Sequence, residues 1–222
     1  QAIREGAWKG TTHGLAGGYV QANLAIVPEA FALDFMRFCQ RNPKPCPVLD
    51  VTDTGNPEFA LAAPGSDVRT DLSGYSIYRD GMLVEELSDI RHLWRDDLVA
   101  FLMGCSLSFD HALRENGLDV AHLKKPGGRI AVYTSGIQCQ PAGQFRGPMV
   151  VSLRPIPRDQ LDRVVEVTSC YPETHGGPVH VGDPAAIGIH DVQAVDWGLP
   201  PEIGPDDVPV FWACGVTPQA VA

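Results

Sequence analysis

The sequence predicts an α/β fold, a mixed-sheet α/β sandwich with an inserted smaller two-layer α+β subdomain. An apolar run at 98–103 ends in a glycine and leads into a helical pattern, as expected of a strand covered on both faces. A second apolar run at 208–213 is likewise followed by cysteine, glycine and a hydroxyl. Between them, a glycine- and proline-rich stretch at 126–148 precedes one strand and one amphipathic helix. We therefore predict two domains, a main α/β domain over 1–118 plus 188–222 and an inserted two-layer subdomain over 119–187.

The N-terminal part begins with a strand and a helix. Residues 20–27 form a predicted strand with Gln21 and Asn23 on one face, where amides usually contact backbone or ligand. Pro28 suits the first position of a helix. Three phenylalanines then recur at helical spacing and predict the core face of that helix: Phe31, Phe35 and Phe38.

Two further elements follow from local signals. The dipeptide Asp80-Gly81 predicts a hairpin between strands at 75–78 and 82–85. A strand at 149–153 and a one-sided helical pattern over 161–168 belong to the predicted subdomain.

Composition limits the partners and the location of the chain. Its 222 residues carry a formal net charge of −10, which argues against nucleic acid or an anionic membrane surface as the main partner. No stretch approaches the roughly 20 apolar residues of a spanning helix, and no signal peptide is recognisable, so we expect no membrane partner. Six cysteines without Cys-x-x-Cys spacing predict reduced thiols and a cytoplasmic protein. Self-association into a homo-oligomer stays open.

The most informative stretch is the turn after the first apolar run. Gly104 permits a sharp turn, and Ser106 or Ser108 can cap the helix that starts there. The first N–H groups of that helix lack intrahelical acceptors, so they would stabilise a carboxylate or a developing oxyanion. Cys105 would lie beside this anion, and the same field would lower its thiol pKa. Cys214 is expected to end a neighbouring strand at the same crevice. Tight packing without a function is the alternative.

A turn-rich loop at 175–184 holds candidates for acid–base chemistry. His180 and Asp183 would protonate a leaving oxygen or deprotonate an amine. The alternatives are hydrogen bonds within the turns and a metal site built from His175, His180 and Asp183, which no motif supports. We expect no metal and no cofactor. The sequence has neither a P-loop nor a dinucleotide-binding glycine motif, so nothing in it supports nucleotide or dinucleotide binding.

A compact charged cluster precedes the hairpin. Arg69 is flanked by Asp67 and Asp71, which suits either a clamp for a substrate carboxylate or an ion-pair knot on the surface.

Nucleophile motifs leave other function classes open. A Ser-His-Asp hydrolase favours Gly-x-Ser-x-Gly, and the segment Gly104-Cys-Ser-Leu-Ser lacks the second glycine. A cysteine-dependent amidase or hydrolase, with Cys105 as nucleophile and His180 as base, stays open. A noncatalytic carboxylate-binding protein is the remaining class.

Several segments carry a distinctive combination of residues: Gly18-Tyr-Val-Gln-Ala-Asn23, Asn42-Pro43 with Cys46-Pro47, Val68-Arg-Thr-Asp71, Gly104-Cys-Ser-Leu-Ser-Phe109, Gly182-Asp-Pro184 and Phe211-Trp-Ala-Cys-Gly-Val-Thr-Pro-Gln219. Together they resemble the D-glutamate cyclase family, whose members are also called hydro-lyases. The resemblance spans nearly the whole chain, from about Arg4 to Gln219. It implies an α/β sandwich with a smaller two-layer domain, and the loss of water from D-glutamate to give 5-oxo-D-proline.

This reaction would need groups that hold a carboxylate, keep an amine neutral and protonate a departing oxygen. The family supplies no residue roles to transfer, so local chemistry assigns them. The predicted catalytic residues are Cys105, His180 and Asp183, with Cys105 favoured as a residue that lines the site. The predicted substrate-binding residues are Asn23, Arg69, Asp71, Ser106, Ser108 and Thr217. We therefore predict a hydro-lyase that acts on a small amino or hydroxy acid.

Overall fold

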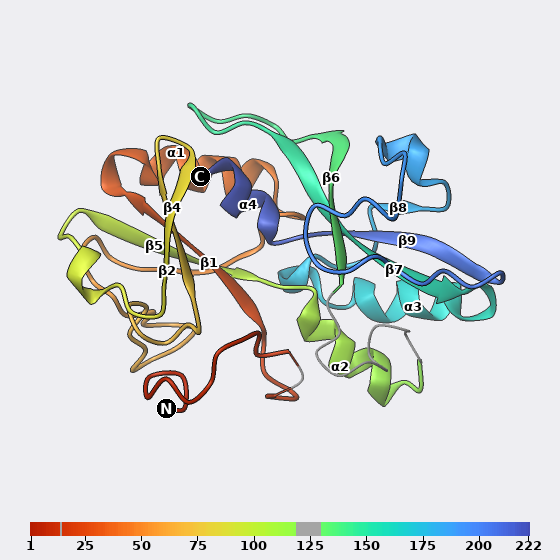
Figure 1. The fold of residues 1–222 in the computed structure, drawn as a ribbon, viewed down its shortest axis with the longest axis horizontal. Coiled ribbons are helices and arrows are strands. Elements are labelled where there is room, and N and C mark those ends of the chain that lie inside the picture. Colours follow the sequence, from red (N-terminus) through yellow and green to blue (C-terminus); the bar gives the residue numbers. More distant parts are fainter. Residues whose placement is uncertain (14, 119–129) are drawn as a thin grey trace.

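Two antiparallel sheets lie side by side along the long axis of the molecule (Figure 1). The computed structural model describes residues 1–13, 15–118 and 130–222. One sheet has the order β1-β5-β2, the other the order β6-β7-β9-β8, and β3 and β4 form a separate hairpin. The strands are β1 (Ala22–Pro28), β2 (Val48–Val51), β3 (Tyr75–Arg79), β4 (Met82–Leu87), β5 (Leu98–Gly104), β6 (Ala131–Gln138), β7 (Pro148–Pro157), β8 (His180–Val181) and β9 (Asp207–Ala213). The α-helices of the described residues are α1 (Glu29–Arg41), α2 (Leu107–Glu115), α3 (Leu161–Ser169) and α4 (Val216–Val221). This combination of helices and sheets confirms the predicted α/β fold class.

The strand β5 is apolar throughout because different segments cover its two faces. On one face, Phe101 packs against α1, and its ring centroid lies 4.8 Å from that of Phe35. On the other face, Ala100 packs with Phe59 and Val68 of the long segment between β2 and β3. Both neighbours of β5 are antiparallel, so its continuous apolar pattern reflects coverage on two sides rather than a parallel sheet.

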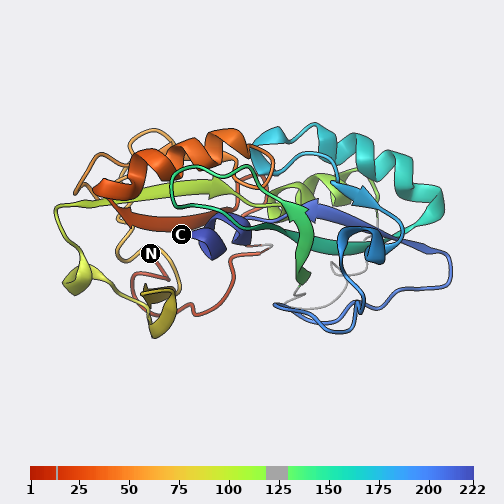
Figure 2. The ribbon, with the colours of Figure 1, turned by 90° about the horizontal axis from the view of Figure 1, so that it is seen from above.

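The helices α1 and α3 lie on the same side of the two sheets (Figure 2). Figure 2 shows α1 above the first sheet and α3 above the second. On the second sheet, Phe109 and Leu113 of α2 share a core with Val164 of α3 and Trp212 of β9. The two layers therefore arise from amphipathic helices that each bury one stripe against a sheet.

The C-terminal strand joins the sheet of the predicted subdomain. β9 pairs with β7 from Val151↔Ala213 to Pro157↔Asp207, and also with β8. The second sheet therefore crosses the predicted boundary at 187, and the division into 1–118 plus 188–222 and 119–187 stays a prediction.

Local signals placed the hairpin correctly and the core face of α1 less well. Asp80 and Gly81 have φ values of 50° and 76°, which is the left-handed conformation that a tight hairpin turn requires. Phe35 and Phe38 are fully buried, whereas Phe31 keeps 40% of its surface exposed. Phe31 thus lies largely outside the buried face of α1, which begins with the partly buried Ala32.

Candidate substrate site at the junction of the two sheets

The chain brings two cysteines together where the sheets meet. In Figure 1, β5 and β9 run toward each other from opposite halves and lead into α2 and α4 near the middle of the molecule. Cys105 and Cys214 directly follow these strands. Their strands belong to different sheets, so the expectation of neighbouring strands is wrong. Their side chains are nevertheless close enough for Cys105 to raise the pKa of Cys214 electrostatically.

Burial dominates the acidity of both thiols. It raises the pKa of Cys105, and the N–H of Leu107, the charge of Arg154 and a hydrogen bond with Asn23 oppose this only in part. Burial likewise raises the pKa of Cys214 to about 12. The expectation of a lowered Cys105 pKa is therefore wrong, because desolvation outweighs the lowering effect of the N–H of Leu107 at the start of α2. At neutral pH both thiols are protonated.

A buried arginine lies beside the thiols. Arg154 of β7 is 0% exposed, and its guanidinium donates to the side chains of Ser152 and Ser106 at 3.1 Å each. It also forms an ion pair of 3.3 Å with Asp110 of α2. Two aromatic rings of the second core lie within 5.2 Å of it, namely Phe109 and Trp212. In the described part of the chain, its Nε–H has no hydrogen-bond partner.

A buried histidine follows the turn that packs against the end of β5. His175 is 1% exposed, and its Nδ1 lies 2.8 Å from the carbonyl oxygen of Lys44. A carbonyl only accepts, so Nδ1 carries the proton and Nε2 presents a lone pair. That Nε2 atom has no partner among the described residues. Burial lowers the pKa of His175 to about 4, and the nearby positive charges of Arg154 and Lys44 contribute in the same direction.

Two glycines let these groups approach one another. A Cβ at Gly104 would lie 1.8 Å from the carbonyl oxygen of Glu173, so only glycine lets the turn before His175 pack against the end of β5. A Cβ at Gly215 would lie 1.7 Å from Nδ2 of Asn23. The first glycine brings His175 towards β5, and the second brings Asn23 to the start of α4.

Asp110 links the buried polar cluster around Arg154 to the N-terminal segment. Its side chain is 2% exposed and lies 3.1 Å from Nε2 of His13 as well as 3.3 Å from Arg154. A carboxylate between two basic groups offsets the cost of burying the arginine charge.

The structure brings part of the predicted substrate-binding set to this junction. Ser106 accepts a hydrogen bond from Arg154, and Asn23 bonds the thiol of Cys105. Ser108 instead exchanges hydrogen bonds with the backbone of Gln21. The hydroxyl of Thr217 is 0% exposed and bonds the backbone of β7. Ser106 and Asn23 therefore contact the polar cluster. The hydroxyls of Ser108 and Thr217 form hydrogen bonds with backbone atoms instead.

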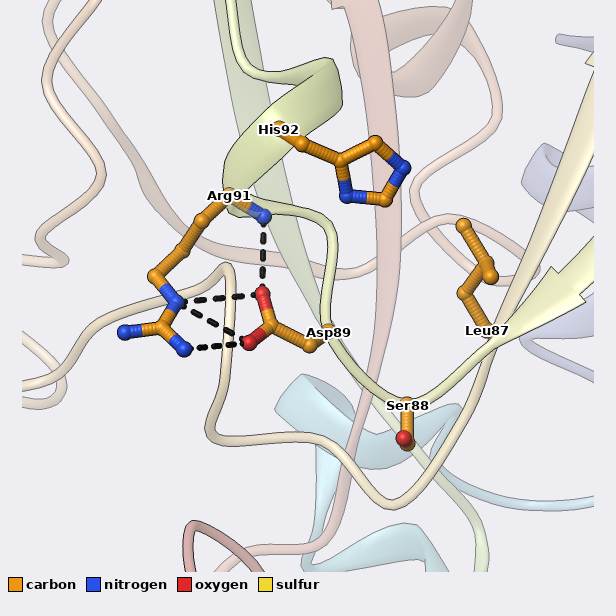
Figure 3. A pocket seen from close by; sticks show the side chains of 5 residues that line it. All are labelled: Leu87, Ser88, Asp89, Arg91 and His92. Carbon is orange, nitrogen blue, oxygen red and sulfur yellow. Dashed lines mark hydrogen bonds and ion pairs between the residues drawn. The ribbon is translucent and has the colours of Figure 1, made fainter.

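The charged cluster at 67–71 forms ion pairs of its own. Arg69 binds Asp67 through Nε at 2.8 Å, and Asp71 pairs with Arg4. A shallow hollow of about 440 Å³ lies on the surface, lined by Leu87, Ser88, Asp89, Arg91 and His92 (Figure 3). In this hollow, Arg91 and Asp89 form an ion pair of 2.6 Å. None of the predicted site residues lines it.

His180 and Asp183 bond within their own turn. Nε2 of His180 lies 2.7 Å from the carbonyl oxygen of Asp183, and the carboxylate of Asp183 accepts from the N–H of Ala185. His180 is held at the edge strand β8 by pairing with Phe211. These are the turn hydrogen bonds that stood as the alternative to an acid–base role, and that role stays a prediction.

No group of three or more metal-ligating side chains occurs in the described ranges. No helix within those ranges is long and apolar enough to cross a membrane.

Sequence reasoning missed Arg154, Asp110 and His13, and it considered His175 only as a metal ligand. The sequence did contain one signal that could have identified Arg154. Arg154 is the only charged residue between 148 and 157, within a strand that is otherwise suited to a core. A lone arginine in such a run requires buried partners. No comparable signal marks Asp110 or His13.

The fold and this junction define an α/β protein with a buried polar cluster between its two sheets. The family model for D-glutamate cyclase matches residues 99–222, which is more than half of the chain. A protein of Stutzerimonas stutzeri is 56% identical over all 222 residues, which cover 83% of its length. One of Bacillus subtilis is 54% identical over 99% of this chain and 85% of its own length. The first is named "Putative hydro-lyase" and the second "Putative hydro-lyase YcsI". The chain therefore belongs to the D-glutamate cyclase family.

A solved structure of a nitrogen repressor-like protein from Methanococcus jannaschii covers 91% of this chain and 76% of its own, with a TM-score of 0.43 and 11% identity. This likeness is too low to bear on function.

Proposed function

We propose that the chain is a hydro-lyase that acts on a small amino or hydroxy acid, with the cyclisation of D-glutamate to 5-oxo-D-proline as the first reaction to test. One observation carries the proposal. The guanidinium of Arg154 is fully buried, and its Nε–H has no partner in the described part of the chain. A buried donor without an acceptor is costly, and a carboxylate is the acceptor that a guanidinium binds best. Family membership and the names of the relatives support the same class.

The surroundings of Arg154 suit a carboxylate. The N-terminus of α2 lies next to it, because Ser106 immediately before the helix accepts from the guanidinium. The partial positive charge at that helix end adds to the charge of Arg154. Cys105 keeps some solvent contact, so the cluster reaches the surface at this residue.

Cyclisation of D-glutamate sets a definite proton balance. The amine nitrogen forms a bond to the distal carboxyl carbon, one C–O bond breaks, and the two protons lost by the ammonium group leave with the oxygen as water. The enzyme therefore has to move protons from nitrogen to oxygen and has no net proton to supply. In this proposal the protonated thiol of Cys105 lines the site, and carboxylate binding by Arg154 requires no thiolate.

Proton NMR of the protein incubated with D-glutamate, L-glutamate, 2-hydroxyglutarate or 5-oxoproline tests the proposal. We expect 5-oxo-D-proline, or a dehydrated hydroxy acid, to form with the unchanged protein and to fall sharply with Arg154→Lys. Arg163→Lys is the matched control, since Arg163 is an exposed arginine paired with Glu166 on α3. No turnover of any of these acids would reject the hydro-lyase proposal for them.

Two further assays on the same protein test the other classes. Release of ammonia from an amide such as glutamine, abolished by Cys105→Ala, would indicate a cysteine-dependent amidase. Thermal stabilisation by a carboxylic acid without turnover would indicate a noncatalytic binding protein.

A further inference from the structure

Two buried polar side-chain atoms lack hydrogen-bond partners in the described part of the chain, and they are opposite in character. Nε of Arg154 carries a hydrogen and is a donor, whereas Nε2 of His175 presents a lone pair and is an acceptor. Both side chains are at least 99% buried. Native proteins satisfy nearly all such atoms, so two orphans of complementary type call for an explanation.

These two atoms belong to one neighbourhood. Glu173 and Thr174, the two residues before His175, pack against Gly104 at the end of β5. Two residues after Gly104, the hydroxyl of Ser106 accepts a hydrogen bond of 3.1 Å from Arg154. The charge of Arg154 also contributes to lowering the pKa of His175. The same polar cluster thus holds an unused donor and an unused acceptor.

We propose that Arg154 and His175 form a two-point site for a carboxylic acid that carries a hydroxyl or amino group on the carbon next to the carboxylate. A carboxylate oxygen accepts from Nε–H of Arg154, and the neighbouring O–H or N–H donates to Nε2 of His175. A simple carboxylate satisfies only the arginine. Because burial keeps His175 neutral and Lys44 fixes its tautomer, Nε2 accepts and does not donate.

This inference deepens the proposed function, since it rests on the carboxylate binding by Arg154 and adds the feature that selects the substrate. Its test measures binding, so it is separate from turnover. A protein that binds hydroxy or amino acids as described but converts none of them would support the site and reject the hydro-lyase.

Calorimetric titration with glutarate, 2-hydroxyglutarate and D-glutamate supplies the three ligands. Glutarate lacks the donor, and the other two carry a hydroxyl and an amine at the same carbon. We expect one of them to bind at least about tenfold more tightly than glutarate, the effect of one buried hydrogen bond. The stronger of the two identifies which donor the site uses. Equal affinity for all three, or binding of none, would overturn the proposal.

Variants at His175 isolate the acceptor. His175→Asn preserves a donor for the Lys44 carbonyl and suits the left-handed conformation of φ 82°, but it removes the Nε2 lone pair. We expect it to bind glutarate as the unchanged protein does and to lose the preference for the hydroxy or amino acid. Arg154→Lys should weaken all three ligands. A preference that survives in His175→Asn would contradict the assignment.

A measurement on the unchanged protein covers the case in which these variants fail to fold. The ¹⁵N resonance of His175 Nε2 moves upfield when that nitrogen accepts a hydrogen bond. We expect this shift with 2-hydroxyglutarate or D-glutamate and no such shift with glutarate. An unchanged resonance at saturating ligand would overturn the two-point site.

Discussion

Replacing Arg154 with methionine should destabilise the protein strongly, because it removes a cation that pairs with the buried carboxylate of Asp110. The substitution keeps a long apolar side chain in the core but removes the ion pair with Asp110 and the hydrogen bonds to Ser106 and Ser152. Removing one partner of a buried pair costs more than the pair contributes, since the remaining charge stays desolvated.

The geometry gives the magnitude. At the 3.3 Å separation of Arg154 and Asp110, and with an effective dielectric constant of about 20, the Coulomb attraction is about 5 kcal/mol. His13 stays near Asp110 and retains part of the compensation. We expect Arg154→Met to lower the free energy of unfolding by about 3 to 5 kcal/mol, which corresponds to a fall in Tm of roughly 10 °C for a chain of this size.

Denaturant unfolding followed by circular dichroism provides the assay, with Asp110→Asn and the double variant completing a cycle. The double variant should be more stable than Arg154→Met alone, because Asp110→Asn removes the buried negative charge with which Arg154 pairs. Arg163→Met serves as the surface control and should change stability by less than about 1 kcal/mol. A loss below about 1 kcal/mol for Arg154→Met, or strictly additive effects in the cycle, would refute the reasoning.

Three further outcomes are expected. Gly104→Ala should cost at least about 1 to 3 kcal/mol in denaturant unfolding, because its Cβ would lie 1.8 Å from a backbone oxygen, whereas Gly74→Ala meets open space and should be mild. Because His175 has a pKa of about 4 when folded and 6.5 when unfolded, the unfolded chain binds more protons between these values. Stability should therefore fall by about 3 kcal/mol as the pH drops from 6.5 to 4, and His175→Asn should lack this part of the slope. Thiol alkylation at neutral pH should modify Cys170 first, since it is exposed while burial raises the pKa of Cys105, and early labelling of Cys105 in a peptide map would contradict that order.

Local sequence patterns predicted much of the fold. The apolar run at 98–103 and Gly104 located β5 and the start of α2, and Asp80-Gly81 located the hairpin. These elements were predictable because hydrophobic period, turn residues and helix starts act within a few residues of each other.

The candidate site was predictable only where it coincides with such local signals. Cys105 and Ser106 stand at a strand end before a helix, and both touch the polar cluster. Arg69 and His180 had equally suggestive neighbours, yet their hydrogen bonds are an ion pair with Asp67 and a turn contact. The spacing of residues along the sequence does not show which side chains a charged group contacts in the folded chain.

The sequence by itself determined the α/β class, the main strands and helices, and the family, because each follows from residue order along one segment or from shared segments. The tertiary structure alone decided that β9 pairs with β7, and that Arg154 and the turn before His175 both pack near the end of β5. It also decided that burial raises the Cys105 pKa rather than lowering it. Pairing, burial and the field of distant charges depend on contacts between segments far apart in the chain, and no local pattern encodes them.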